Sequence, residues 1–182
     1  MSILKVNTIQ DLSGNPNKGK VIQVVQSTKT DTASVTGSTF GDVGLSASIT
    51  PSATNHKILI MIQANIGASV GYDMKARLFT SYGASPPGQP LHIGDAGGTR
   101  PRASVSITQT YAATNNAYNA DQAIITYLDG GHNQTTSITY SLQLASYSTY
   151  TVYLNRSGAD LESSGSYDAR TASSITLMEI SD

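Results

Sequence analysis

The feature of the sequence that most constrains its fold is an alternation of apolar and polar residues with a period of two. It is cleanest in SITYSLQLA, which places four apolar residues on one face: Ile138, Tyr140, Leu142 and Leu144. Successive side chains of a β-strand point to opposite faces, so we expect these four to point inward. No window shows a helical period of 3.6 residues over more than about two turns. The sequence therefore predicts a nearly all-β domain.

Eight or nine segments have this strand character and are separated by Gly- and Pro-rich connections. They are residues 20–28, 44–50, 56–68, 73–81, 102–110, 121–129, 136–146, 149–157 and 173–181. The third segment is apolar on both faces at one end. One face carries Ile58, Ile60, Ile62 and Ile66, and the other carries Leu59 and Met61. We expect this strand to be covered on both sides there.

Composition excludes several classes of partner. Only 13% of the residues are charged, the net charge is −1, and no run of Lys or Arg occurs. Binding nucleic acid or an anionic membrane surface needs clustered positive charge, so we expect neither partner. The longest apolar run, residues 58–62, is too short to span a membrane, and the opening is not a secretory signal. Cysteine is absent, so disulfides and thiolate sites are excluded.

No motif predicts catalysis or a cofactor. The three histidines have no metal-ligand spacing, and no serine stands in a Gly-x-Ser-x-Gly turn. Glu162 and Glu179 are the only glutamates, and we expect Glu179 to point outward, where its charge would blunt a sheet edge or pair across subunits. The sequence therefore predicts a protein that is not an enzyme and that needs no metal or cofactor.

Two long connections, residues 82–102 and 111–122, are candidate binding surfaces, because long ordered connections in a compact domain are usually functional. The candidate ligand-binding residues in them are His92, Asp95, Tyr111, Asn115, Asn116, Tyr118 and Asn119. Tyrosine rings and asparagine amides together suit sugar rings or polar protein surfaces. The alternatives are that the connections are tolerated insertions, and that their tips pack on neighbouring loops.

The first residues, ILKVNTIQDLSGN, place an apolar side chain at every third position: Ile3, Val6 and Ile9. The segment is too short for a stable helix and too sparse for a core of its own. We expect symmetry-related copies or a neighbouring protein to cover it, and the alternative is a disordered terminus. The expected organisation is an extended attachment and trimerisation segment, residues 1–20, followed by a β domain, residues 21–182.

Several stretches carry a resemblance to a known group of proteins. They are the opening followed by a Val- and Ile-rich strand, SITPSATNHKILIMI, TYTVYLNRSGAD and RTASSITLMEI, which together cover most of the chain. They resemble small tail-fibre and virion structural proteins of tailed phages of marine bacteria and cyanobacteria. The resemblance implies a jelly-roll β-sandwich of the tumour-necrosis-factor and complement-head type. It also implies a homotrimer whose N-terminal segment is attached to other virion proteins.

The last predicted strand supports a trimer on physical grounds. It is apolar on both faces, with Ile175 and Leu177 on one and Met178 and Ile180 on the other. One face can join the core of the subunit while the other meets a symmetry axis. Burying a further 500 Å² or so of apolar surface per subunit would contribute on the order of 12 kcal/mol before ordering costs.

The expected function is that of a virion protein, a trimeric tail fibre or tail tip that contacts a glycan or protein on the host surface. The alternative is a capsid decoration protein, or head fibre. A polysaccharide depolymerase is disfavoured, because the sequence offers few acids for a catalytic pair.

Overall fold

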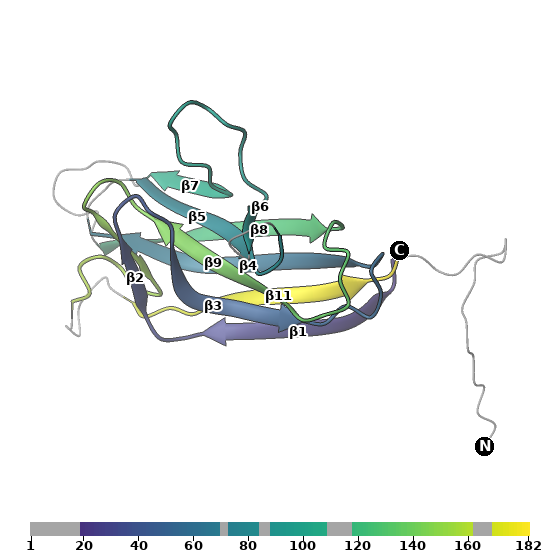
Figure 1. Cartoon of the computed structure of the whole chain (residues 1–182). Helices are drawn as coiled ribbons and strands as arrows, with labels where there is room; N and C mark the ends of the chain where they lie inside the picture. Colours follow the sequence, from purple (N-terminus) through teal and green to yellow (C-terminus); the bar gives the residue numbers. More distant parts are fainter. Residues whose placement is uncertain (1–18, 70–72, 84–87, 109–117, 162–168) are drawn as a thin grey trace, which may run out of the picture.

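The computed structural model describes residues 19–69, 73–83, 88–108, 118–161 and 169–182. These residues form eleven β-strands, and no α-helix occurs among them. The strands make two antiparallel sheets that pack face to face (Figure 1). The predicted all-β sandwich is confirmed.

The first sheet has six strands: β1 (Val21–Lys29), β2 (Ala33–Thr36), β4 (Lys57–Ala68), β8 (Ala120–Asp129), β10 (Thr151–Leu154) and β11 (Ser173–Ile180). Strand β4 is central and pairs with β8 along one edge. Along its other edge it pairs first with β11, through residues 57–63, and then with β10, through residues 66–68. Strand β1 lies outside β11, and β2 lies outside β10.

The second sheet has five strands: β3 (Gly41–Ile49), β5 (Asp73–Thr80), β6 (Gln89–Leu91), β7 (Val105–Thr108) and β9 (Ile138–Ala145). Their order is β3-β9-β5. Strands β7 and β6 both pair with the other edge of β5, β7 with residues 73–76 and β6 with residues 78–80. The chain crosses repeatedly between the sheets, giving the orders β1-β11-β4-β8 and β3-β9-β5-β7 of a jelly roll. The first and last strands are neighbours, as the resemblance implied.

The core lies between the two sheets and consists of their inward-facing side chains. The isoleucines expected to share one face of β4 are at most 1% exposed. The four apolar residues of the clean alternation in β9 are also buried. The period of two thus placed the right side chains in the core.

Every predicted segment contains a strand, although β7 and β10 are shorter than predicted. Strands β2 and β6 were not predicted, because three or four residues are too few to show a period. Strand β10 ends because Asn155 adopts a left-handed backbone (φ 63°). That conformation is stabilised by Asn155 Nδ2, which donates to the carbonyls of Lys29 (2.8 Å) and Asp31 (2.9 Å).

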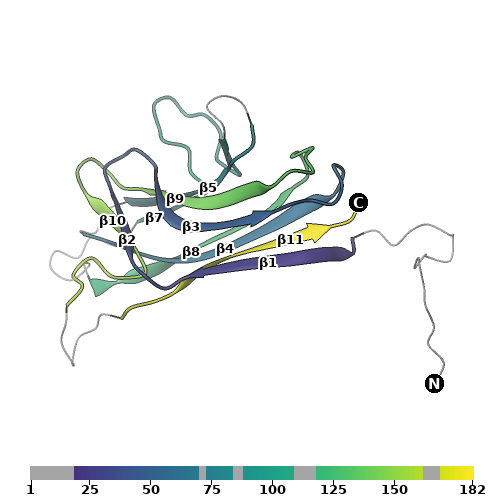
Figure 2. The same ribbon diagram turned by 60° about the horizontal axis from the view of Figure 1, so that its bottom comes forward.

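The sandwich has two distinct ends (Figures 1 and 2). At the terminal end, formed by residues 19–21, 50–57, 130–137 and 180–182, the start of β1 meets the C-terminus. There Gly19 N donates to Ser181 O (2.9 Å) and Lys20 N to Ser181 Oγ (3.0 Å). The opposite, distal end includes the connections of residues 37–40 and 146–150, together with Tyr118 and Asn119 at the start of β8. Ile3, Val6 and Ile9 lie outside the described residues.

Two Gly→Ala substitutions test the packing of β4. A Cβ on Gly67 would lie 2.5 Å from Arg156 O and 3.0 Å from Asn119 O, whereas a Cβ on Gly94 meets nothing within 4 Å. We expect Gly67→Ala to lower the free energy of unfolding by about 1–3 kcal/mol through overpacking against backbone. Gly94→Ala should leave it unchanged or raise it by up to about 1 kcal/mol. Denaturant unfolding measures both, and equal effects would contradict this packing.

Candidate functional site

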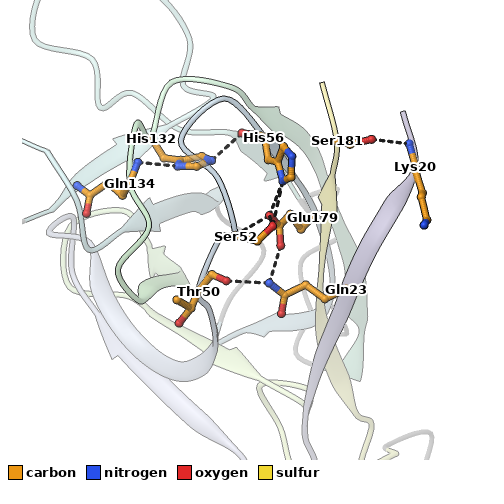
Figure 3. Close-up of polar contacts among 9 residues, drawn as sticks. All are labelled: Lys20, Gln23, Thr50, Ser52, His56, His132, Gln134, Glu179 and Ser181. Carbon is orange, nitrogen blue, oxygen red and sulfur yellow. Dashed lines mark hydrogen bonds and ion pairs between the residues drawn. The ribbon is translucent and has the colours of Figure 1, made fainter. Parts of the chain in front are cut away.

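A buried carboxylate organises the terminal end of the sandwich (Figure 3). Glu179, the last inward-facing residue of β11, is 0% exposed. Its Oε1 accepts hydrogen bonds from Ser52 N (2.7 Å) and Ser52 Oγ (2.6 Å) and lies 2.6 Å from His56 Nδ1. Its Oε2 accepts from Gln23 Nε2 (2.6 Å). The carboxylate therefore ties together β1, β11 and the connection between β3 and β4.

The expectation that Glu179 points outward is wrong. In a strand with a period of two, residue 179 must share a face with Ile175 and Leu177, and all three are buried. The prediction followed the general rule that charges are exposed. That rule fails here because four polar contacts replace the water around the carboxylate.

The same contacts set the acidity of Glu179. Burial alone would raise the pKa of the carboxyl group, but hydrogen bonds from Ser52, Gln23 and His56 outweigh burial and lower the pKa to about 2. The group is therefore ionised in the folded protein at any pH above about 3. An ionised carboxylate that is bonded through both oxygens to three other residues is suited to a structural role.

The arrangement of Ser52, His56 and Glu179 is not that of a catalytic triad. In a triad the serine and the acid use opposite nitrogens of the imidazole ring. Here both Ser52 Oγ (3.2 Å) and Glu179 approach Nδ1, and Ser52 Oγ also donates to the carboxylate. The imidazole therefore lies beside the serine–glutamate hydrogen bond, not between the two groups.

A second histidine holds the backbone behind this cluster. His132 is 3% exposed, its Nε2 donates to His56 O (2.8 Å), and its Nδ1 accepts from Gln134 N (3.1 Å). The accepting role of Nδ1 assigns the proton to Nε2. The connection between β8 and β9 is thereby joined to the one between β3 and β4.

A second buried acid lies in the same row of the sheet. Ile58 of β4 is paired with Glu179 on one side and with Asp129 of β8 on the other. Asp129 Oδ2 accepts from the hydroxyls of Tyr82 (2.6 Å) and Tyr140 (2.7 Å). Burial and the adjacent carboxylate raise the pKa of both phenols, so they remain hydrogen-bond donors. Two hydrogen-bonded acids thus close the core at the terminal end.

The outer face of the first sheet carries an apolar row that runs across four strands. Its members stand in register: Val24 of β1, Met178 of β11, Leu59 of β4 and Leu128 of β8. Val24 and Leu128 are 55% and 47% exposed. Val21, Ile22 and Ile124, three further exposed apolar residues, also belong to β1 and β8. We call these residues, together with Met61 and Ile180, the apolar sheet face.

This face carries almost no charge. Among the outward positions of β1, β4, β8 and β11, Lys57 is the one charged residue, and it pairs with Asp182 (3.1 Å) at the terminal edge. The outer face of the second sheet differs, since there Asp73 pairs with Lys75 and the Arg77 guanidinium stacks on Phe40 at 4.1 Å. An exposed apolar surface with few charged residues is typical of the centre of a protein interface.

A pocket of ≈ 270 Å³ opens on the same face, between Gln26, Met61, Ile124 and Thr176. It combines apolar walls with neutral polar groups from all four strands. The face is therefore uneven enough to receive a side chain from a partner.

The predicted assembly residues of β11 lie on two opposite faces, as expected, but one of the two pairs is not available for contact with another subunit. Ile175 and Leu177 are fully buried in the core, whereas Met178 and Ile180 point outward and are half-buried. The other predicted assembly residues, Ile3, Val6 and Ile9, lie outside the described part of the chain.

The predicted ligand-binding residues do not form one cluster. Tyr111, Asn115 and Asn116 lie outside the described residues. Tyr118 and Asn119 lie at the distal end, whereas the His92 ring lies 5.3 Å from that of Tyr127 near the other end of β8. Eight residues of strand separate the two places, roughly 26 Å. His92 and Asp95 are both exposed, and no hydrogen bond joins them in the described part of the chain.

Sequence reasoning missed Asp129, Tyr82, Ser52 and Gln23. The period of two in β8 does place Asp129 on the same face as Ile125, so counting along the strand would have marked it as inward. No comparable signal marks Ser52 or Tyr82, because both lie in connections and meet their partners only in the folded chain.

Among the described residues, no group of three potential metal ligands occurs, and no helix is long and apolar enough to cross a membrane.

The low pKa of Glu179 predicts acid sensitivity. A carboxyl group whose pKa is lowered by folding stabilises the protein at pH values above the pKa of that group in the unfolded chain, 4.5. This contribution is lost as the pH falls towards about 2. We expect a loss of about 3 kcal/mol in unfolding free energy across that range. Glu179→Gln should be less stable than wild type at pH 7 and approach it near pH 2. Parallel pH profiles from denaturant unfolding would contradict the prediction.

No model of a known protein family matches the sequence, and no curated protein matches it. Among solved structures, the chain shows a weak similarity to the structure of infectious bursal disease virus Gx strain, at 10% identity and a TM-score of 0.39. The VP2 subviral particle of the same virus matches at 8% identity, also with a TM-score of 0.39. The alignments cover 98% and 97% of this chain but only 46% of either matched chain. A structural similarity this weak gives no information about the function of this chain.

Proposed function

We propose that this chain is a structural protein of a tailed-phage virion that assembles as a homotrimer through its apolar sheet face and contacts the host surface. The observation that carries the assembly is the apolar row of β1, β11, β4 and β8. The virion assignment is supported by the sequence resemblance to small phage structural proteins.

The energetic argument for assembly follows from exposure. Monomeric proteins rarely expose contiguous apolar patches larger than a few hundred Å². Covering about 500 Å² of this face per subunit would contribute on the order of 12 kcal/mol before the costs of association. A surface of this kind is more stable against a partner than in water.

The charge distribution favours a second copy as that partner. Identical surfaces that carry charge repel one another on contact, and this face avoids the problem because it is nearly uncharged. The lone Lys57 lies at the edge and is already paired with Asp182. A threefold arrangement is the one that the resemblance implies.

The ends of the sandwich support an orientation on the particle. Strand β1 begins at the terminal end, so the preceding segment is connected to the domain there. This segment, with Ile3, Val6 and Ile9, is proposed to attach to other virion proteins. The distal end then faces away from the particle. Its connections are proposed to contact a glycan or protein of the host, with three copies binding together.

In this proposal the chain acts by binding and not by catalysis. The two buried acids that lie in one row, Glu179 and Asp129, already accept hydrogen bonds from neighbouring side chains. A carboxyl group with a pKa of about 2 cannot serve as a general acid near neutral pH.

A capsid decoration protein is the second candidate, because a neutral apolar sheet face also suits a capsid neighbour. Gold-labelled antibody on intact particles distinguishes the two. We expect label at the tail. Label on the head surface would favour the second candidate, and an unlabelled particle would refute both.

The assembly is tested by placing a charge on the apolar row. We expect Leu128→Glu to weaken trimer formation at least 100-fold, because a buried unpaired carboxylate is costly in an interface. Ser48→Glu adds the same charge to an exposed position on the outer face of the second sheet and should leave the trimer intact. Sedimentation velocity over a concentration series measures both. A stable wild-type monomer at micromolar concentration would contradict the proposed assembly.

A further inference from the structure

An exposed tyrosine lies at the distal end, in the turn between β9 and β10. Tyr147 is 58% exposed. Its ring lies 6.4 Å from that of Tyr150, at an interplanar angle of 22°. The two tyrosines therefore form a stacked pair in which Tyr147 is more than half exposed to solvent.

The turn that carries this pair is held firmly. Tyr150 N donates to Tyr147 O (3.0 Å), which closes the turn. The neighbouring connection fastens it from the side, because Gly37 N donates to Tyr150 O (3.0 Å) and Ser146 N donates to Gly37 O (2.8 Å). Ser146 itself is fully buried. The exposed ring thus stands on a rigid base, so binding a ligand costs little ordering entropy.

The backbone at the tip is strained. Ser148 has a φ of 50°, a left-handed conformation that costs non-glycine residues free energy. The packing leaves little freedom next to it, since a Cβ on Gly37 would lie 3.3 Å from Ser148 O. The strained residue directly follows Tyr147 in the chain.

The chemistry around the ring selects the class of ligand. The two connections that meet here, residues 37–40 and 146–150, contain only Gly, Ser, Thr, Phe and Tyr. They offer hydroxyl groups and flat rings but no charge. Nucleic acid would need positive groups for its phosphates. A neutral sugar ring fits, because its C–H face packs on an aromatic ring while its hydroxyls exchange hydrogen bonds with Ser and Thr.

We propose that the Tyr147–Tyr150 turn is a binding site for a neutral sugar ring. The inference rests on the proposed host-contacting function and names the class of ligand and the residues that bind it. Tyr147 supplies the stacking surface, Tyr150 supports it from behind, and the hydroxyls of Ser148 and Thr149 flank the ring. A single site of this size is weak, with a dissociation constant in the millimolar range, and three copies on one particle strengthen it by avidity.

The test uses the full chain and defined probes. The probes are methyl glycosides of glucose, galactose, mannose, rhamnose and N-acetylglucosamine, titrated while the ring signals of Tyr147 and Tyr150 are followed by NMR. We expect at least one probe to shift both signals in a saturable way. Tyr147→Ala should weaken binding of that probe at least tenfold, whereas Tyr147→Phe, which keeps the ring, should stay within threefold of wild type.

Leu161→Ala is the control, because it removes another exposed apolar side chain (50% exposed) outside this turn and should leave binding unchanged. Sedimentation velocity and circular dichroism verify that each variant is folded and assembled. Undiminished binding by Tyr147→Ala, or saturable shifts confined to other residues, would overturn the site.

Binding to whole host cells separates this inference from the proposed function. If wild type binds cells and Tyr147→Ala binds them equally, the sugar site is refuted and host contact stands. If wild type binds neither cells nor any probe, both are refuted.

Discussion

The fold depends on strand β4, which is hydrogen-bonded along both edges and carries the inward isoleucines at the centre of the core. The two faces of this strand have different roles. Ile58, Ile60 and Ile62 point into the sandwich, while Leu59 and Met61 between them point out of it. The same strand therefore supplies both the core and the middle of the apolar sheet face, so any change of register would exchange the two surfaces.

The two buried acids show how the core is closed where polar connections begin. Glu179 and Asp129 flank Ile58 in one row, and each is surrounded by donors from other parts of the chain. Replacing water with Ser52, Gln23 and His56 makes burial of a charge tolerable, because every donor is already placed by the backbone that holds it. The result is a terminal end whose connections are held together by hydrogen bonds, and the chain enters β1 at this end.

The two ends and two faces of the sandwich suit different tasks. The apolar sheet face is neutral and broad, which suits contact with another copy. The second sheet carries Asp73, Lys75 and Arg77 on its outer face, which suits water. At the distal end, the stacked tyrosines on the β9–β10 turn are small and rigid, which suits a small ligand repeated on several subunits. Assembly and recognition are thus proposed to use separate surfaces, so that one can change without the other.

The sequence by itself determined the strands and the facing of their side chains. A period of two depends only on backbone geometry, so Tyr140 and Leu142 in β9 were assigned correctly without tertiary information. The jelly-roll architecture was implied by the resemblance, and the order of the strands came from the structure, since pairing joins residues far apart in the chain. Only the tertiary structure decided that Glu179 is buried, that Val24 and Leu128 stand in one row, and that His92 lies far from Tyr118. These relations depend on which segments contact one another in the folded chain, and a local sequence pattern does not specify those contacts.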